Sequence, residues 1–200
     1  MNICVITPLY PIVGRDDIKT DTQAIHLLLK YLVGDNNIHV FNISRISPRH
    51  VMGSFFKKGE NLNEQYDYTI DGINATLLRY RAFPKQKMLT QAQINKVQEK
   101  IKITLNKNGF CPDVVVVHIP SSFPGITSGL FEGIKRIAVL HRTDINIIAS
   151  INKLSNMINQ QYDVISSRSR SVQKKAYSLS INIDEKIAFS GIPEKFLDKS

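Results

Sequence analysis

Short runs rich in Val and Ile alternate with amphipathic stretches along almost the whole chain, and this alternation is the strongest constraint on the fold. It is typical of a parallel sheet whose crossover helices cover both faces. The sequence therefore predicts an α/β fold, a Rossmann-like three-layer domain with a mostly parallel central sheet. The predicted strands cover residues 3–7, 38–43, 73–80, 113–117, 136–140, 162–166 and 186–189, and the predicted helices begin near Asp21 and cover residues 90–106, 146–158 and 170–179.

Two local signals refine these elements. Apolar residues at helical spacing from Ile25 to Leu32 predict a core-facing stripe, with Gly34 as the C-terminal stop of the first helix. Alternating residues before Asp71-Gly72, followed by a β-branched run, predict a hairpin at that turn.

Length and composition fit one globular domain. The chain has 200 residues, of which 42% are hydrophobic and 22% charged, and neither a repeat nor a linker divides residues 1–200. Cys4 and Cys111 lie far apart in the sequence, so neither a disulfide framework nor a zinc site is expected. Because the N-terminus lacks signal-peptide features and no apolar run approaches the ~18 residues of a membrane span, we expect a cytoplasmic protein with, at most, peripheral contact with the inner face of the cell membrane.

Motifs of several common α/β chemistries are missing. The loop after the first strand holds a single glycine, Gly14, so it carries no GxGxxG motif for NAD or FAD. The chain also lacks the GxxxxGK[ST] phosphate loop, the GxSxG nucleophile elbow and the HExxH metal motif. We therefore expect no metal and no cofactor in this domain.

Polar residues follow several predicted strands at the edge where open α/β sheets bind ligands. Strands 114–117 and 137–140 lack polar alternation and are expected in the centre of the sheet, covered on both faces. His118 ends the first of them and His141 follows the second, with Asp144 as the predicted N-cap of the next helix. His118 alone has an alternative interpretation as a capped structural residue; two histidines at the ends of neighbouring strands favour a site.

Positive charge dominates one stretch of a chain whose net charge is +9. The residues from 79 to 107 include eight basic side chains, opposed only by Glu99. The simplest interpretation is a solvated helix face; the alternative is a patch that docks on anionic lipid or a phosphate-bearing acceptor. Nucleic acid is disfavoured because no recognition motif accompanies the charge. The candidate patch comprises Arg79, Arg81, Lys85, Lys87, Lys96 and Lys100.

Five segments in order resemble the N-terminal half of GT-B glycosyltransferases, especially the retaining family-4 group. They are residues 3–11, 112–118, 137–144, 162–167 and 186–196, and together they cover essentially the whole chain. The resemblance implies a hexosyltransferase half that binds a glycan or glycolipid acceptor, while a nucleotide sugar is the co-substrate of a C-terminal donor domain supplied in cis or in trans. It also suggests a role in bacterial surface polysaccharide or glycolipid synthesis.

The resemblance carries roles onto particular residues. His141 matches the active-site histidine, whose imidazole could hydrogen-bond the transferring sugar or a nearby hydroxyl. The substrate-binding positions that it implies or that the strand ends suggest are Tyr10, Gly14, Thr20, His118, Ser121, Ser122, Arg142, Asp144, Ser167 and Arg168.

The sequence departs from this family at two points. Lys19-Thr20 replaces the usual glycine pair before the first helix, and only glycine lets a backbone approach a phosphate without a Cβ in the way. The donor-binding domain is expected to be absent, so the chain alone should not turn over. A different class of function stays open: a non-catalytic basic module for an anionic glycan or membrane surface.

Overall fold

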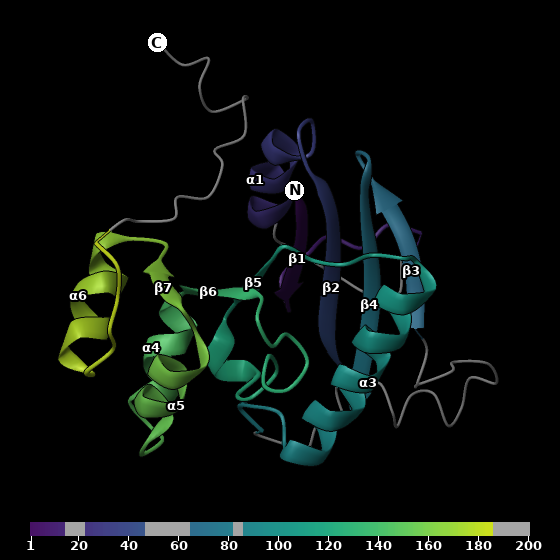
Figure 1. Ribbon diagram of the computed structural model, residues 1–200. Helices are drawn as coiled ribbons and strands as arrows, with labels where there is room; N and C mark the ends of the chain where they lie inside the picture. The colour runs from purple at the N-terminus through teal and green to yellow at the C-terminus, as the bar shows by residue number, and fades with distance from the viewer. Residues whose placement is uncertain (15–22, 47–64, 82–85, 186–200) are drawn as a thin grey trace, which may run out of the picture.

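The computed structural model describes residues 1–14, 23–46, 65–81 and 86–185. Within them, seven strands form one sheet in the order β3-β4-β2-β1-β5-β6-β7 (Figure 1). Every neighbouring pair is parallel except β3 with β4, so the predicted α/β fold is confirmed. The strands are β1 Asn2–Thr7, β2 Asn37–Ile46, β3 Gln65–Ile70, β4 Ile73–Arg81, β5 Val114–His118, β6 Lys135–Leu140 and β7 Val164–Ser167.

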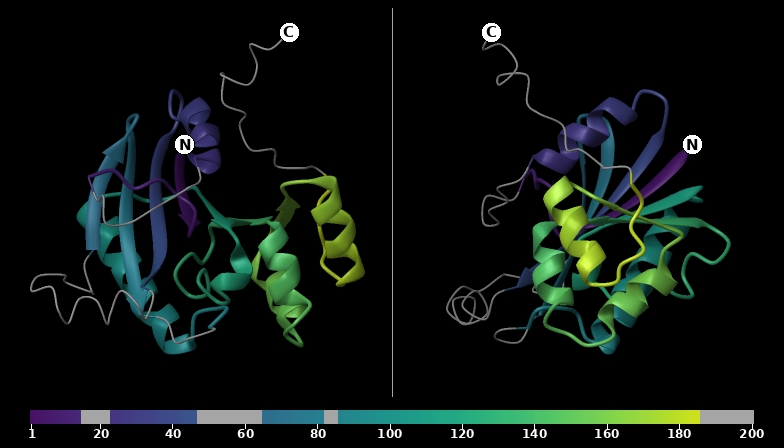
Figure 2. Two further views of the ribbon diagram at one scale, coloured as in Figure 1. Left: turned by 180° about the vertical axis from the view of Figure 1, so that it is seen from behind. Right: turned by 90° about the vertical axis from the view of Figure 1, so that its left-hand side faces the viewer.

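Helices lie against both faces of this sheet. Helix α1 packs on one face, α3 packs on the other, and α4, α5 and α6 gather around β6 and β7 (Figures 1 and 2). None of the helices among the described residues is both long and apolar enough to span a membrane. Their bounds are α1 Ala24–Leu32, α3 Gln91–Lys107, α4 Arg142–Ile148, α5 Leu154–Gln161 and α6 Arg170–Ser178, and Pro120–Ser122 form a 3₁₀ turn.

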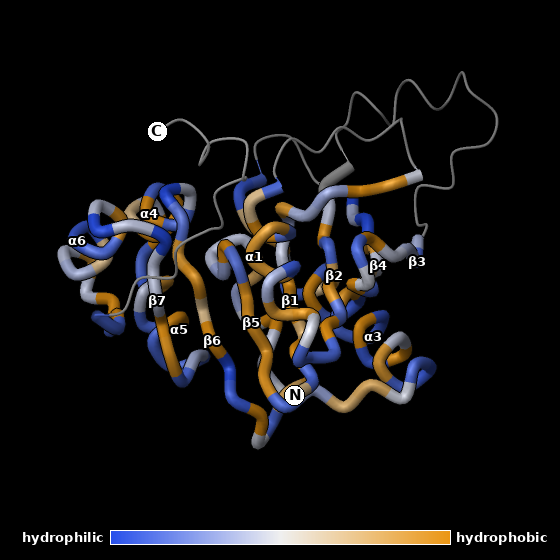
Figure 3. The backbone as a smooth tube through the Cα atoms, turned by 90° about the horizontal axis from the view of Figure 1, so that it is seen from above, coloured by the Kyte–Doolittle hydropathy of each residue, from blue (hydrophilic) through white to orange (hydrophobic). Residues whose placement is uncertain are grey.

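The sheet separates two apolar clusters, which makes the domain three-layered. Ile25 and Leu29 of α1 belong to the smaller cluster, whereas Val97 and Ile101 of α3 belong to the larger one. Strand β5 contributes to both because its successive side chains point to opposite faces. Its apolar character stands out in Figure 3. Burial on both faces explains why this strand shows no polar alternation.

The position of β6 differs from expectation. The middle strand of the sheet is β1, and β6 lies next to the edge strand β7. Only the second half of β6 is fully buried, from Ala138 to Leu140, while Lys135 is exposed. The apolar second half of β6 therefore gave the sequence pattern of a central strand, although β6 lies next to the edge. This half is buried because the helices around β6 and β7 cover it.

Two helix predictions are corrected as well. The helix expected at residues 146–158 is two helices, α4 and α5, because Lys153 adopts a left-handed φ of 68° between them. Helix α1 ends at Leu32, and its C-cap is Val33 in a right-handed conformation rather than Gly34. Leu32 is 39% exposed, and His26 is buried in its place on the core-facing side. The strand expected at residues 186–189 lies outside the described residues.

The predicted hairpin is confirmed. Strands β3 and β4 pair antiparallel, and Asp71 and Gly72 connect them with φ values of 47° and 77°. Two consecutive left-handed residues define the type I′ turn, which matches the right-handed twist of the strands. Glycine adopts this conformation without the steric cost that a Cβ introduces.

Replacing Gly72 by alanine should therefore destabilise the domain by about 1–2 kcal/mol, the cost of a left-handed L-residue. Gly34→Ala is the matched control, because Gly34 has no positive φ and nothing lies within 4 Å of an added Cβ. Urea denaturation of both variants measures the difference. Equal free energies of unfolding would contradict the turn assignment.

Candidate functional site

Two histidines meet at the carboxyl edge of the sheet. His118 is the last residue of β5, and His141 follows β6 directly. Their rings touch through His118 Nδ1 and His141 Nε2, 3.1 Å apart, with the ring planes inclined by 70°. Because the two strands are parallel neighbours, their carboxyl ends share one edge, and the sequence-predicted pair is brought together.

Asp144 holds the backbone around both histidines. Its carboxylate accepts from the N–H of Ser121 at 2.9 Å and from the N–H of His141 at 2.7 Å. One side chain therefore connects the turn after β5 to the first turn of α4. The predicted N-cap role of Asp144 is wrong: His141 occupies the N-cap, and Asp144 is the third helical residue. The carboxylate reaches back to the N-cap N–H, which is the acidic half of a capping box.

Backbone strain lies beside His118. Ile119 has φ 56° and ψ 56°, the left-handed conformation, and its side chain is buried. A β-branched residue there is a genuine outlier that costs about 1–3 kcal/mol. The conformation turns the chain into the Pro120–Ser122 turn, whose Ser121 N–H then faces Asp144. The bonds to Asp144 are thus one of the interactions that hold this strained turn in place.

Burial shifts the pKa values of the titratable side chains at the carboxyl edge. It lowers the pKa of His118 to about 3, with His141 and Arg168 adding to the effect, and it lowers the pKa of His141 to about 4. Both rings are therefore neutral near pH 7, and one of them donates the hydrogen bond between them. Burial also raises the pKa of Asp144 to about 6, although its hydrogen bonds to Ser121 and His141 oppose that rise.

Arg168 supplies the positive charge at this edge. Its backbone N–H donates to the carbonyl of Leu140 at 3.1 Å, which fixes the backbone of Arg168 beside the end of β6. The guanidinium is half-buried, burial lowers its pKa, and its charge acts on both histidines. A guanidinium beside neutral imidazoles is suited to binding a phosphate group.

Three predicted substrate-binding serines have different surroundings. Ser121 is buried and uses its backbone N–H to hold Asp144. Ser167 is also buried, and its hydroxyl donates to the carbonyl of Ser169. Ser122 is half-buried, and its carbonyl accepts from the N–H of Leu89. Ser167 thus uses its hydroxyl within its own turn, whereas the buried Ser121 hydroxyl oxygen has no hydrogen-bond partner among the described residues.

The structure also corrects the picture of the loop after β1. Tyr10 is completely buried, and its hydroxyl is 3.0 Å from His26 Nδ1, so the ring belongs to the core. Gly14 is exposed with φ 74°, and a Cβ there would lie 2.5 Å from the Tyr66 hydroxyl oxygen. The contact with Tyr66 and the positive φ therefore explain a glycine at this position without a ligand. Thr20 lies outside the described residues.

Arg142 lies in a different hollow. It is exposed at the start of α4 and, with Ser171 and Lys175 of α6, lines a hollow of about 130 Å³. His141 is not among the residues that line this hollow, and the role of Arg142 in substrate binding stays a prediction.

Four of the six predicted patch residues share one groove. Arg79, Arg81, Lys96 and Lys100 line a groove of about 660 Å³ between β4 and α3, which we call the basic groove. Arg79 is only 8% exposed, and its Nε has no hydrogen-bond partner in the described part of the chain. Lys87 lies elsewhere and donates to the Ser150 hydroxyl at 3.2 Å. Lys85 lies outside the described ranges.

Sequence reasoning missed two buried histidines with polar partners. His26 connects the Tyr10 hydroxyl to the Asp71 carboxylate, at 3.0 and 3.1 Å. His39 is 2.9 Å from the Thr76 hydroxyl, which donates to Asp67. The position of His26 inside the apolar stripe of a helix was a sign that this histidine is buried. Nothing local indicated the same for His39, whose partners lie on other strands.

Two solved bacterial enzymes have a similar fold. α,α-Trehalose 6-phosphate synthase from Burkholderia multivorans matches with a TM-score of 0.51 and 11% identity, covering 89% of this chain and 43% of that chain. The α,α-trehalose-phosphate synthase (UDP-forming) from Burkholderia vietnamiensis matches with a TM-score of 0.52 and 10% identity, covering 89% and 42%. No protein-family model and no curated protein matches the sequence.

These similarities establish the fold. Both enzymes are GT-B glycosyltransferases, and the α/β sheet of this chain matches their Rossmann-like domains. The chain spans less than half the length of either enzyme.

The neutral histidines should make stability pH-dependent. Unfolded histidine takes up its proton near pH 6.5, whereas His39, His118 and His141 stay neutral in the fold until about pH 4, 3 and 4. Between these limits the unfolded state binds more protons, so stability falls as the pH is lowered from 6.5 to 4. Asp144 has the opposite effect from pH 6 to 4, because its folded pKa is raised to about 6. The three histidines together outweigh this single carboxyl group, so the net stability still falls.

His118→Asn removes one group that binds a proton only in the unfolded state. The slope of the free energy of unfolding against pH should therefore decrease by about 1.4 kcal/mol per pH unit. Urea denaturation of the parent and the variant from pH 4.5 to 6.5 measures both slopes. Identical slopes would mean that His118 is already protonated in the folded state.

Proposed function

We propose that this chain is the acceptor-binding half of a sugar-nucleotide-dependent glycosyltransferase of the family-4 type, acting in bacterial surface polysaccharide or glycolipid synthesis. The observation that carries the proposal is the pair His118 and His141 beside Arg168 at the carboxyl edge, where open α/β sheets bind their ligands. The similar fold and the partial coverage of two glycosyltransferases support it. A second, donor-binding domain supplies the nucleotide sugar, in cis or in trans.

The proposed chemistry assigns the edge residues as follows. An acceptor hydroxyl oxygen bonds to the anomeric carbon of the sugar while the bond from that carbon to the nucleotide phosphate breaks. The acceptor proton passes to the departing diphosphate or to solvent. Neutral His141 hydrogen-bonds the transferring sugar or the nearby hydroxyl as charge develops, and Arg168 binds a phosphate of the acceptor. His118 positions His141 through their shared hydrogen bond.

Acceptor binding can be tested on the chain as it stands. A short-chain polyprenyl diphosphate carrying one hexose should shift the backbone amide signals of His118, His141 and Arg168 in the ¹⁵N-labelled protein. UDP-glucose should leave them unchanged, and the chain should transfer no labelled sugar by itself. Robust transfer by this chain alone would refute the half-enzyme proposal; shifts confined to other regions would refute the site.

In the transferase reconstituted with its donor domain, His141→Ala should lower turnover about 100-fold or more, the usual contribution of a positioned proton donor or acceptor. Thr143→Ala is the matched control, because Thr143 is an exposed side chain on the same turn. Circular dichroism confirms that both variants fold. Unchanged turnover in His141→Ala would remove this histidine from the reaction.

The basic groove favours a second candidate function, a non-catalytic module for an anionic glycan or membrane surface. Arg79, Arg81, Lys96 and Lys100 converge there, with Glu99 as the acidic residue of the lining. The buried Nε of Arg79 has no partner within the described ranges, which is unusual, since buried polar atoms normally have partners. An anion in the groove would supply one.

Charge reversal tests this alternative. Arg81→Glu with Lys96→Glu should weaken co-sedimentation with phosphatidylserine vesicles at least tenfold at low salt, since each basic residue contributes about 1 kcal/mol near an anionic surface. Lys135→Glu with Lys153→Glu alters charge equally at exposed positions away from the groove. Equal losses in the two double variants would indicate net charge alone, and the absence of binding by the parent would exclude the membrane version.

A further inference from the structure

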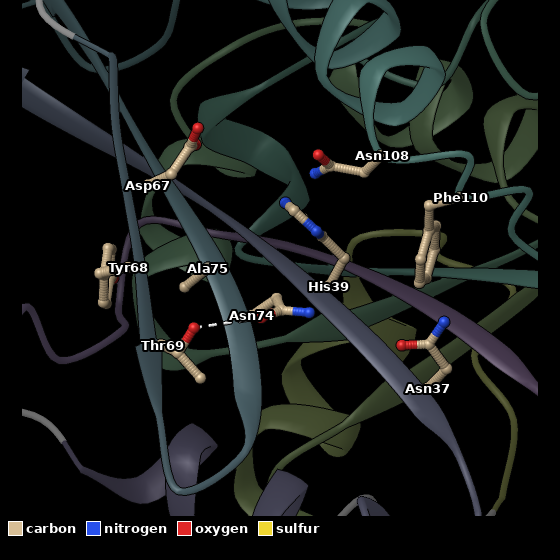
Figure 4. A pocket seen from close by; sticks show the side chains of 9 residues that line it. All are labelled: Asn37, His39, Asp67, Tyr68, Thr69, Asn74, Ala75, Asn108 and Phe110. Atoms are coloured by element: carbon tan, nitrogen blue, oxygen red, sulfur yellow. Dashed lines mark hydrogen bonds between the residues drawn. The ribbon is translucent and has the colours of Figure 1, made fainter.

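The opposite, amino edge of the sheet holds a second polar cavity, which we call the amino-edge pocket (Figure 4). Its volume is about 340 Å³, at the lower end of the range of about 300–1,000 Å³ for small-molecule sites. Asn37 is the first residue of β2 and Asn74 is the second residue of the parallel strand β4, so the pocket lies at the other end of the strands from His118 and His141. Its lining includes Asn37, His39, Asp67, Asn74, Asn108 and Phe110.

A hydrogen-bond chain fixes the polar floor of this pocket. The Thr76 hydroxyl donates its only proton to Asp67 Oδ1 at 2.7 Å. It must therefore accept from His39 Nε2, which lies 2.9 Å away. This assigns the ring proton to Nε2 and leaves Nδ1 as the hydrogen-bond acceptor of the imidazole. Burial lowers the pKa of His39 to about 4, so the ring is neutral near pH 7.

The end of helix α3 forms the opposite wall. Asn108 is the C-cap, and Gly109 follows with φ 59°. The left-handed glycine reverses the chain so that the Phe110 N–H donates to the carbonyl of Leu105 at 2.9 Å. As a result, an exposed carboxamide and the ring of Phe110 both face strands β2 and β4 (Figure 4).

The chemistry of this lining selects a neutral ligand. An anion would meet the carboxylate of Asp67, and the nearby ammonium of Lys107 lies 3.9 Å from that same carboxylate. A metal ion would need more ligands, because the described residues contain no group of three His, Cys, Asp or Glu side chains. Carboxamides both donate and accept, as sugar hydroxyls do, while Asp67 accepts only. Asn74 Oδ1 accepts from the Thr69 hydroxyl and Asn37 Nδ2 donates to Asn2, so Asn74 offers its amide N–H groups, Asn37 its carbonyl oxygen and Asn108 both. Phe110 is buried in the larger apolar cluster and packs edge-on against the His39 ring, so it closes this wall of the pocket.

We propose that the amino-edge pocket is a second, non-catalytic carbohydrate site that binds one neutral saccharide unit through Asn37, Asn74 and Asn108. The site is separate from the carboxyl edge and does not rest on the proposed function.

The test uses the full ¹⁵N-labelled chain, titrated separately with D-glucose, D-galactose and N-acetylglucosamine. At least one sugar should cause saturable shifts of the side-chain amide signals of Asn37, Asn74 and Asn108. Asn108→Ala and Asn74→Ala should each weaken that binding about tenfold. Asn156→Ala is the control, since Asn156 is an exposed carboxamide on α5 that does not line the pocket.

Three results would overturn the proposal: no saturable shift with any of the three sugars, equal affinity in the pocket and control variants, or saturation of the same amides by inorganic phosphate instead. Using two pocket variants guards against misfolding of one, because Asn74 lies on a strand and Asn108 at a helix end. Failure here leaves the acceptor test at the carboxyl edge unaffected, since that test follows different amide signals.

Discussion

The buried carboxylate of Asp144 is the interaction on which the carboxyl edge depends. It binds two backbone N–H groups, one in the turn after β5 and one at the start of α4. Without it, the left-handed Ile119 beside His118 would lose a restraint, and His141 would lose the bond that fixes its backbone. Its raised pKa reflects how costly a buried charge is unless donors surround it.

The broad arrangement could be predicted from the sequence because it follows from periodicity. Apolar runs located the strands, and parallel strands necessarily place His118 and His141 at one edge. The hairpin could be predicted because Asp71 and Gly72 adopt the left-handed conformations that its turn requires. In physical terms, these features need only the period of the side chains and the conformational preference of two turn residues.

What could not be predicted depends on contacts between distant segments. Tyr10 is buried because Asn42 binds its carbonyl and His26 binds its hydroxyl, from elements far along the chain. No local signal places Ile119 in a left-handed conformation, since β-branched residues avoid it. The role of Asp144 was misjudged because α4 begins one turn earlier than its apolar pattern indicates.

The buried histidine pair at the carboxyl edge is expected to be neutral rather than charged near pH 7. Long-range ¹H–¹⁵N spectra of the imidazole rings at pH 7 test it most directly, because they report protonation and tautomer together. The structure predicts that His118 and His141 are both neutral and that a single proton lies between His118 Nδ1 and His141 Nε2. An imidazolium signal from either ring at that pH would contradict it.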